Sequence, residues 1–179
     1  MKNVLNKTDL VSNYKPIYES NGKWCVCFNY VELMKEVNPV LINGKCVKSN
    51  DVESTGMCSF NYMVYDSKPS IETIKTDIKE HIDEKVKYKI INGFVWNGCR
   101  VTLSKENQMN YKSMYDIVQS NNTLFPIRIK CSKNGKTEYI IFYSANEYSD
   151  FYISSVKHIN KCLEEGWKEK DNFDTSLYK

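Results

Sequence analysis

Few residues of this chain have side chains suited to chemistry, and they do not form a recognised catalytic or metal-binding pattern. Cys25 and Cys27 are two residues apart, so a strand would place both thiols on one face, where Cys46, Cys58 or His81 would have to supply the other zinc ligands. Structural zinc sites commonly use two Cys-x2–4-Cys pairs, and no second pair follows here. We therefore expect neither a metal nor a cofactor.

The histidines and carboxylates also lack the partners that catalysis requires. His81 and His158 fall on separate predicted helices, with no spacing that suggests a nucleophile or an orienting group. The clustered carboxylates lie among lysines, as on solvated helix surfaces: Glu80, Asp83, Glu84, Glu164 and Glu165. The seven glycines form no phosphate-binding loop. The sequence therefore predicts a non-enzymatic protein with no catalytic residues.

Composition narrows the class of protein further. A hydrophobic content of 41% in 179 residues supports a folded core, and a net charge of +3 without basic clusters gives no support for nucleic-acid binding. No apolar stretch is long enough to cross a membrane, and no secretory signal precedes the seven cysteines, which we expect to be reduced.

The excess of lysine, asparagine, isoleucine and tyrosine over alanine indicates an AT-rich genome. The 13 tyrosines and three tryptophans also suit a sugar-binding platform or a protein interface, although codon usage alone raises the tyrosine count.

The first third of the sequence predicts a small β-rich unit. We expect an extended arm or linker at residues 1–22, a strand at 23–30, a hairpin at 40–47 turning at Asn43-Gly44, and a polar loop at 51–56. A further strand at 57–65 would place Cys58, Phe60, Tyr62 and Val64 on one face. Residues 31–37 suit either a strand or a short helix.

The rest of the sequence predicts three helices that alternate with two hairpins. The first helix, 71–91, would be capped by Ser70 and end at a left-handed Gly93, and the hairpins would turn at Asn97-Gly98 and Asn134-Gly135. Ser104 would cap the second helix, and Ser144 with Glu147 would start a third that stops at Gly166, before a fraying tail. The second and third helices would bury these residues: Met109, Met114, Ile117, Val118, Phe151, Val156, Ile159 and Leu163.

These elements predict an α+β fold in which antiparallel hairpins pack with three helices, preceded by the β-rich unit. The expected domains are an arm and docking unit at 1–68, an α+β domain at 69–171 and a polar tail at 172–179. Six residues are the expected core or interface anchors: Ile71, Ile74, Ile78, Ile82, Phe94 and Trp96. We expect the isoleucine stripe to pack against Phe94 and Trp96; the alternative is that Trp96 is an exposed ligand platform.

Five features between residues 71 and 171 occur together in a fixed order: the run from Ile91 to Gly98, the run from Leu103 to Gln108, Phe125-Pro126, the aromatic run 139–143 and the closing helix 151–166. On these features, residues 71–171 resemble a phage-associated domain of unknown function that is found beside tail-fibre and tail-assembly genes in phages and prophages of gut Bacteroidales. The resemblance covers a little over half of the chain and leaves out the first 68 residues. It implies a virion component, and the AT-rich bias suits a Bacteroides phage of the crAss-like type, but it brings no catalytic residue.

The leading functional prediction is therefore a phage structural protein, an adaptor or a tail-fibre or head-fibre appendage, assembled in the host cytoplasm. Its expected partners are other virion proteins (capsid, tail or fibre subunits) and further copies of itself, as a dimer or a trimer. The alternative is a receptor-binding module at a fibre tip that binds a cell-surface glycan through exposed Trp and Tyr. A small phage enzyme or host-takeover factor ranks last.

Overall fold

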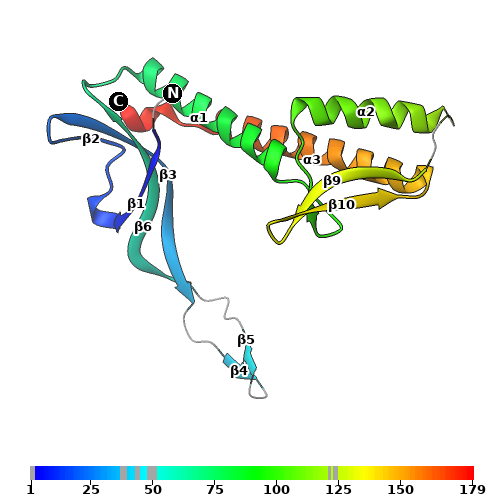
Figure 1. Cartoon of the computed structure of the whole chain (residues 1–179). Coiled ribbons are helices and arrows are strands. Elements are labelled where there is room, and N and C mark those ends of the chain that lie inside the picture. The colour runs from blue at the N-terminus through cyan, green and yellow to red at the C-terminus, as the bar shows by residue number, and fades with distance from the viewer. Residues whose placement is uncertain (1–2, 37–39, 43–44, 48–51, 121, 123–124) are drawn as a thin grey trace. The chain divides into compact units, whose positions relative to one another are not determined.

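The computed structural model describes residues 3–36, 40–42, 45–47, 52–120, 122 and 125–179 (Figure 1). It confirms the α+β class, with antiparallel sheets and three long helices. The chain forms two compact units: an N-terminal unit, Met1–His81 with Asp174–Lys179, and a C-terminal unit, Ile82–Phe173. The division falls inside helix α1 (Ile71–Asn92), whereas the sequence placed a domain boundary before that helix.

The N-terminal unit holds an antiparallel sheet with strand order β1-β6-β3-β2. The expected arm at residues 1–22 is wrong, because two of the four strands lie there. β1 pairs with β6 from Leu5↔Tyr62 to Leu10↔Met57, and Asn21-Gly22, both with positive φ, turn β2 into β3. The elements are β1 (Leu5–Leu10), a 3-10 turn (Val11–Asn13), β2 (Ile17–Ser20), β3 (Lys23–Glu36) and β6 (Val52–Tyr65).

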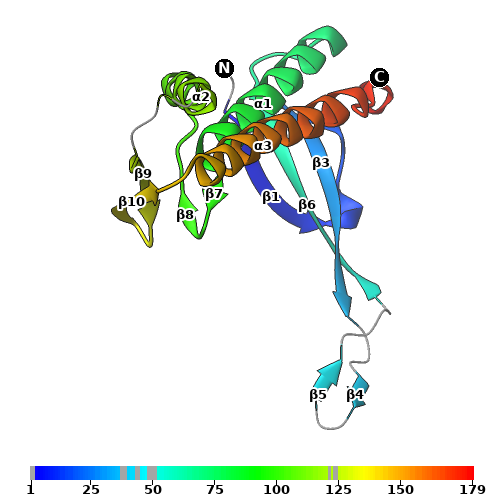
Figure 2. The ribbon, with the colours of Figure 1, turned by 90° about the vertical axis from the view of Figure 1, so that its right-hand side faces the viewer.

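β3 and β6 are both longer than predicted and run side by side in Figures 1 and 2. The undecided segment is strand as far as Glu36, and the expected loop at 51–56 is strand from Val52 onward, since Glu36 pairs with Val52. Asn29 and Gly56 have positive φ near two shifts in register, which lets the ladder continue past irregular positions. The predicted hairpin is confirmed as β4 (Val40–Ile42) paired with β5 (Lys45–Val47); its turn residues, 43 and 44, lie outside the described residues.

Both faces of the N-terminal sheet are buried near its centre. Cys27, Cys58 and Phe60 form a cluster on one face, against which Tyr62 packs as predicted. The alternate residues face the first turns of α1, where the Tyr65 hydroxyl lies 2.8 Å from a carboxylate oxygen of Asp77. The tail does not fray: a 3-10 turn (Thr175–Tyr178) brings the buried Tyr178 hydroxyl within 2.8 Å of the Cys27 carbonyl oxygen.

The C-terminal unit confirms the predicted order of helix, hairpin, helix, hairpin, helix. Its sheet has strand order β10-β9-β8-β7, and Asn97-Gly98 and Asn134-Gly135 turn the two hairpins with positive φ at each position. The serine at position 104 caps α2 and that at 144 caps α3, as predicted. The elements are β7 (Val95–Trp96), β8 (Cys99–Arg100), α2 (Lys105–Gln119), β9 (Ile127–Lys133), β10 (Lys136–Phe142) and α3 (Ala145–Asp171).

Gly93 directly follows the last residue of α1, as predicted, and its N–H donates to the Lys89 carbonyl oxygen at 2.8 Å, but it does not adopt the expected left-handed conformation. A Cβ at Gly93 would lie 2.5 Å from that oxygen, so the position requires glycine. The predicted helix stop at Gly166 is wrong. Gly166 lies inside α3, which continues to Asp171, and a Cβ there would overlap Val86 of α1. The second half of α1 and the C-terminal half of α3 therefore run in close contact within this unit (Figure 2).

The core of the C-terminal unit forms around Phe151 of α3 and includes Tyr111 and Val118 of α2. The predicted inward face of α2 is partly wrong. Met114 packs against the core, but Met109 is 72% exposed and Ile117 is also exposed, because α2 turns Tyr111 toward the sheet instead. On α3, Phe151 is fully buried, whereas the other three predicted positions are half-buried: Val156, Ile159 and Leu163.

Candidate functional site

The six predicted anchors are divided between separate clusters. Ile74, Ile78 and Ile82 are buried along α1, and Ile71 is half-buried at its start. Phe94 is buried and Trp96 half-buried in the cluster around Phe151, to which α1 contributes Ile90 and none of the four isoleucines. The hairpin therefore packs its Phe94 and Trp96 against α3, whereas the sequence placed them against the isoleucine stripe.

The cysteines and histidines occupy core and boundary positions. The six cysteines other than Cys46 are free and buried, and burial raises the pKa of the Cys27 thiol to about 12. His158 Nε2 lies 3.1 Å from the Lys89 carbonyl oxygen and 3.7 Å from Cys162 Sγ. The His81 ring contacts the Phe28 ring in an edge-to-face arrangement. Within the described part of the chain, no group of three or more His, Cys, Asp or Glu residues is placed to hold a metal ion.

The helix carboxylates of the C-terminal unit form ion pairs between α1 and α3. Lys85 Nζ lies 2.8 Å from a Glu169 oxygen, and Lys89 Nζ lies 3.2 Å from a Glu165 oxygen. The hydrogen bond from Lys89 lowers the pKa of Glu165. Ion pairs as exposed as these contribute little to stability, and they pair each carboxylate with a lysine of the facing helix and not with a second carboxylate.

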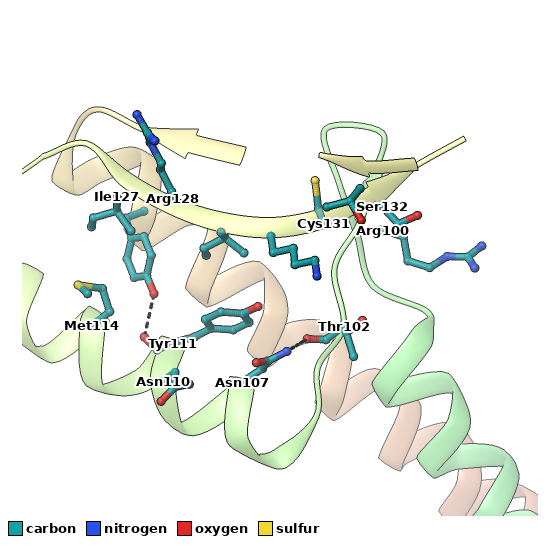
Figure 3. A pocket seen from close by; sticks show the side chains of 14 residues that line it. Arg100, Thr102, Asn107, Asn110, Tyr111, Met114, Ile127, Arg128, Cys131 and Ser132 are labelled. Carbon is teal, nitrogen blue, oxygen red and sulfur yellow. Dashed lines mark hydrogen bonds between the residues drawn. The ribbon is translucent and has the colours of Figure 1, made fainter. Parts of the chain in front are cut away.

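Sequence reasoning missed a concave site, a pocket of about 610 Å³ between β9 and α2 (Figure 3). Tyr111 and Met114 reach into it from α2, and Ile127 from β9. The buried Tyr148 lines it as well, and its hydroxyl donates to the Tyr111 carbonyl oxygen at 3.1 Å. The pocket therefore has an apolar floor built by buried aromatic and aliphatic side chains.

The charged part of this lining is entirely basic. Among the described residues that line the pocket, Arg100, Arg128 and Lys130 are charged, and none is acidic. Apart from the strand ladder, none of the three forms a hydrogen bond or ion pair within the described part of the chain. Arg100 and Arg128 are the two arginines of a chain with 23 lysines. The rarity of arginine was the one signal that the sequence offered. It does not show that the two arginines meet, because only the fold brings them to one pocket.

The outer face of the β9–β10 hairpin continues this basic surface. Directly opposite strand residues share a face, so Arg128 lies beside Ile141 and Lys130 beside Tyr139. Figure 3 shows Arg128 directed away from α2, onto this outer face. Tyr139 and Tyr143 are 62% and 67% exposed. The arrangement suits binding of an anionic group beside an apolar or aromatic one.

The tryptophans do not form an exposed pair. Trp96 packs edge-on against Phe151 with ring centroids 5.8 Å apart, while Trp167 is exposed on α3. In the N-terminal unit, the Lys68 ammonium lies 5.3 Å from the centre of the Trp24 ring.

No helix among the described residues is long and apolar enough to cross a bilayer.

Comparison with known protein families, with curated proteins and with solved structures finds no match to this chain.

Proposed function

We propose that this chain is a non-enzymatic structural component of a phage particle, an adaptor or fibre-type appendage of the tail or capsid, that docks through its N-terminal unit. The observation that carries the proposal is a two-stranded extension of that unit. From here on we call this extension the arm; it is not the segment 1–22 for which the sequence predicted an arm. The arm comprises residues 31–36 of β3 and 52–56 of β6, beyond the positions where β2 and β1 pair with those strands.

Most of the arm is exposed, and Leu33 is half-buried. Val31, Met34 and Val52 each expose more than half of their surface, at 58%, 51% and 52%. Within the described residues, no other segment pairs with either side of the arm (Figure 1). The arm carries its own polar contacts, such as the bond from Thr55 Oγ1 to the Leu33 carbonyl oxygen at 2.7 Å.

An isolated two-stranded ribbon is marginally stable in water, and exposed apolar side chains on an open edge favour pairing with another chain. The arm therefore has the properties of a segment that a neighbouring subunit covers in an assembly. A docking role of this kind needs no catalytic residues, which is consistent with the helix carboxylates being used in ion pairs and the thiols being buried.

Incorporation into purified particles tests the proposal. The triple variant Val31→Thr, Met34→Thr and Val52→Thr keeps β-forming side chains but removes the apolar surface. We expect it to fold and to be at least tenfold depleted from particles by quantitative mass spectrometry. The matched control, Tyr88→Gln with Trp167→Gln, removes exposed aromatic side chains from α1 and α3 and should be incorporated normally.

Two results contradict the proposal in different ways. If the wild-type chain is missing from purified particles, the protein is not a virion component. If the triple variant is incorporated as well as the wild type, the protein docks through a surface other than the arm.

A glycan-binding function is the second candidate, and the exposed Tyr139 and Tyr143 favour it. Sugar rings stack on exposed aromatic side chains, and Lys130 beside Tyr139 would suit an acidic sugar. In this case Tyr139→Ala with Tyr143→Ala should abolish binding to host-cell glycans in an array or adsorption assay, while particle incorporation stays unchanged.

A further inference from the structure

One edge of β9 is open beside the pocket. β9 pairs with β10 at all seven positions, but on its other side it meets β8 only at the pair Arg100↔Ser132. The hairpin turns at Asn134-Gly135, so Lys133 and Lys136 form the first hydrogen-bonded pair, and alternate residues of β9 bond to β10. The backbone N–H and C=O groups of Arg128 and Lys130 therefore point away from β10. In the described part of the chain, nothing pairs with them.

Open strand edges are normally covered or blocked, because their unpaired groups bind extended segments of other chains. At β9 the edge borders the pocket of about 610 Å³, which leaves room beside the strand (Figure 3). Asn107 and Asn110 of α2 line the opposite wall and offer further hydrogen-bonding groups. An open edge combined with a pocket for alternate side chains is the usual arrangement for recognition by strand addition.

The basic side chains at this edge favour an acidic partner. Side chains of an added strand alternate, so every second one would lie on the outer face beside Arg128 and Lys130, and those between would face Tyr111 and Met114. The outer positions meet three cations with no carboxylate among the described lining residues. Arginine binds carboxylates through two parallel hydrogen bonds, so acidic side chains fit the outer positions.

We propose that an extended acidic segment of a partner protein adds as a strand to the β9 edge. Its backbone bonds to Arg128 and Lys130, its carboxylates contact Arg100, Arg128 and Lys130, and its intervening apolar side chains enter the pocket beside Tyr111. The proposal goes beyond the docking of the arm, since it concerns a different unit and holds for the isolated chain whether or not it belongs to a particle.

An anionic glycan or a single-stranded nucleic acid would use the same cations differently. Such ligands would contact the outer face through Tyr139 and the basic side chains, and they have no regular ladder of amides to pair with the strand edge. Protection of the Arg128 and Lys130 amides therefore separates strand addition from the other two classes.

Nuclear magnetic resonance of the full chain tests the proposal with an eight-residue peptide that alternates Glu and Val. We expect saturable shifts and slowed hydrogen exchange at the Arg128 and Lys130 amides, and binding at least tenfold tighter than that of the matched peptide with Lys in place of Glu. Arg128→Glu with Lys130→Glu should lose at least tenfold in affinity. Lys133→Glu with Lys136→Glu, which changes the charge equally at the hairpin tip, should retain binding.

A backbone variant separates the edge amide from the side-chain charge. Lys130→Ala removes only the charge, whereas Lys130→Pro also removes an N–H that points away from β10, so the β9–β10 ladder is kept. The proline variant should bind the Glu-Val peptide more weakly than the alanine variant, with an otherwise unchanged spectrum of the folded state.

Three outcomes overturn the proposal. They are absence of binding at millimolar Glu-Val peptide, new protection at the opposite edge (Thr137, Tyr139 and Ile141) without protection at β9, and tighter binding of a sulfated oligosaccharide or an oligothymidylate that leaves the β9 amides unprotected.

Discussion

At the scale of single residues, the aromatic side chains of the C-terminal unit converge on Phe151. The ring centroids of five residues lie between 5.2 and 5.9 Å from its own, in tilted or edge-on geometry: Phe94, Trp96, Tyr111, Phe142 and Tyr148. Contacts of this kind add to the burial of apolar area. The surplus of aromatic residues is therefore partly explained by one core, and not only by codon usage or an interface.

Trp96 should act as a core anchor. Trp96→Ala removes a half-buried ring from Phe151 and should reduce the free energy of unfolding by about 2–4 kcal/mol. Trp167→Ala, on the exposed surface of α3, should change it by less than about 0.5 kcal/mol. Thermal and denaturant melts of the two variants check this. A Trp96→Ala protein that melts like the wild type but fails to bind its partner would instead identify Trp96 as a ligand platform.

The buried thiols should be inert. Thiolates are the reactive form, and burial raises the pKa of Cys131 to about 11, with a further contribution from its hydrogen bond to Cys99. In a Cys46→Ser background, we expect no thiol of the native protein to react with Ellman's reagent within minutes at pH 8. Reductant should leave the melting temperature unchanged, because the six cysteines other than Cys46 are free thiols. Rapid modification of a thiol in the native protein would contradict this.

Asp9 should make the N-terminal unit sensitive to acid. Its carboxylate accepts hydrogen bonds from Lys7, from Asn13 and from the Leu10 N–H, which lower its pKa from 3.8 to about 2. A carboxyl group whose pKa is lowered on folding stabilises the protein fully above its unfolded pKa and loses that contribution as pH falls toward the folded pKa. Between pH 4 and pH 2, the melting temperature of Asp9→Asn should therefore fall less steeply than that of the wild type. Parallel slopes would show that the carboxylate does not contribute.

At the scale of elements, local signals predicted the turns and caps well, and long-range pairing poorly. Asn97-Gly98 and Asn134-Gly135 identified two hairpins because Asn and Gly accept positive φ. Asn21-Gly22 carries the same signal, but β1 and β2 lack a clear alternation, and the partner of β1 lies far along the chain in β6. Pairing across such a distance leaves no mark in a local pattern.

The same reasoning explains why the pocket was missed. The alternation Ile127-Arg128-Ile129-Lys130 predicts a strand with one basic face. Whether that strand has an open edge depends on where β8 turns away into α2, which the residues of β9 do not determine.

The contact between α1 and α3 depends on Gly166. Gly166→Ala would place a methyl group against Val86 and should destabilise the fold by about 1–3 kcal/mol through overpacking. In a Val86→Ala background the space is free, and the same substitution should stabilise the helix by up to about 1 kcal/mol, because alanine is the better helix former. Chemical denaturation of the four proteins in this cycle checks the change of sign. Destabilisation of equal size in both backgrounds would exclude the contact as the cause.

At the scale of the whole molecule, each of the two units contains an open four-stranded sheet with two edge strands. In the described residues, β1 and β2 end one sheet and β7 and β10 end the other, and the β9 edge is open beside the pocket. Natural proteins block such edges when they remain monomeric. The two proposed docking surfaces therefore belong to different units, the arm to one and the β9 edge to the other.

The last prediction is that the chain forms a homo-oligomer, with the outer edge of β10 as its contact. β10 is a terminal strand whose Tyr139 and Ile141 side chains are exposed, and two copies related by a two-fold axis would pair β10 with β10 antiparallel. Sedimentation equilibrium at high micromolar concentration should detect the oligomer. Ile141→Lys should shift it toward monomer, since an edge lysine opposes strand pairing, whereas Ile153→Lys on α3 should not. A monomeric wild type under these conditions would contradict the prediction. Because the contact uses β10, it would leave the β9 edge free for an acidic strand.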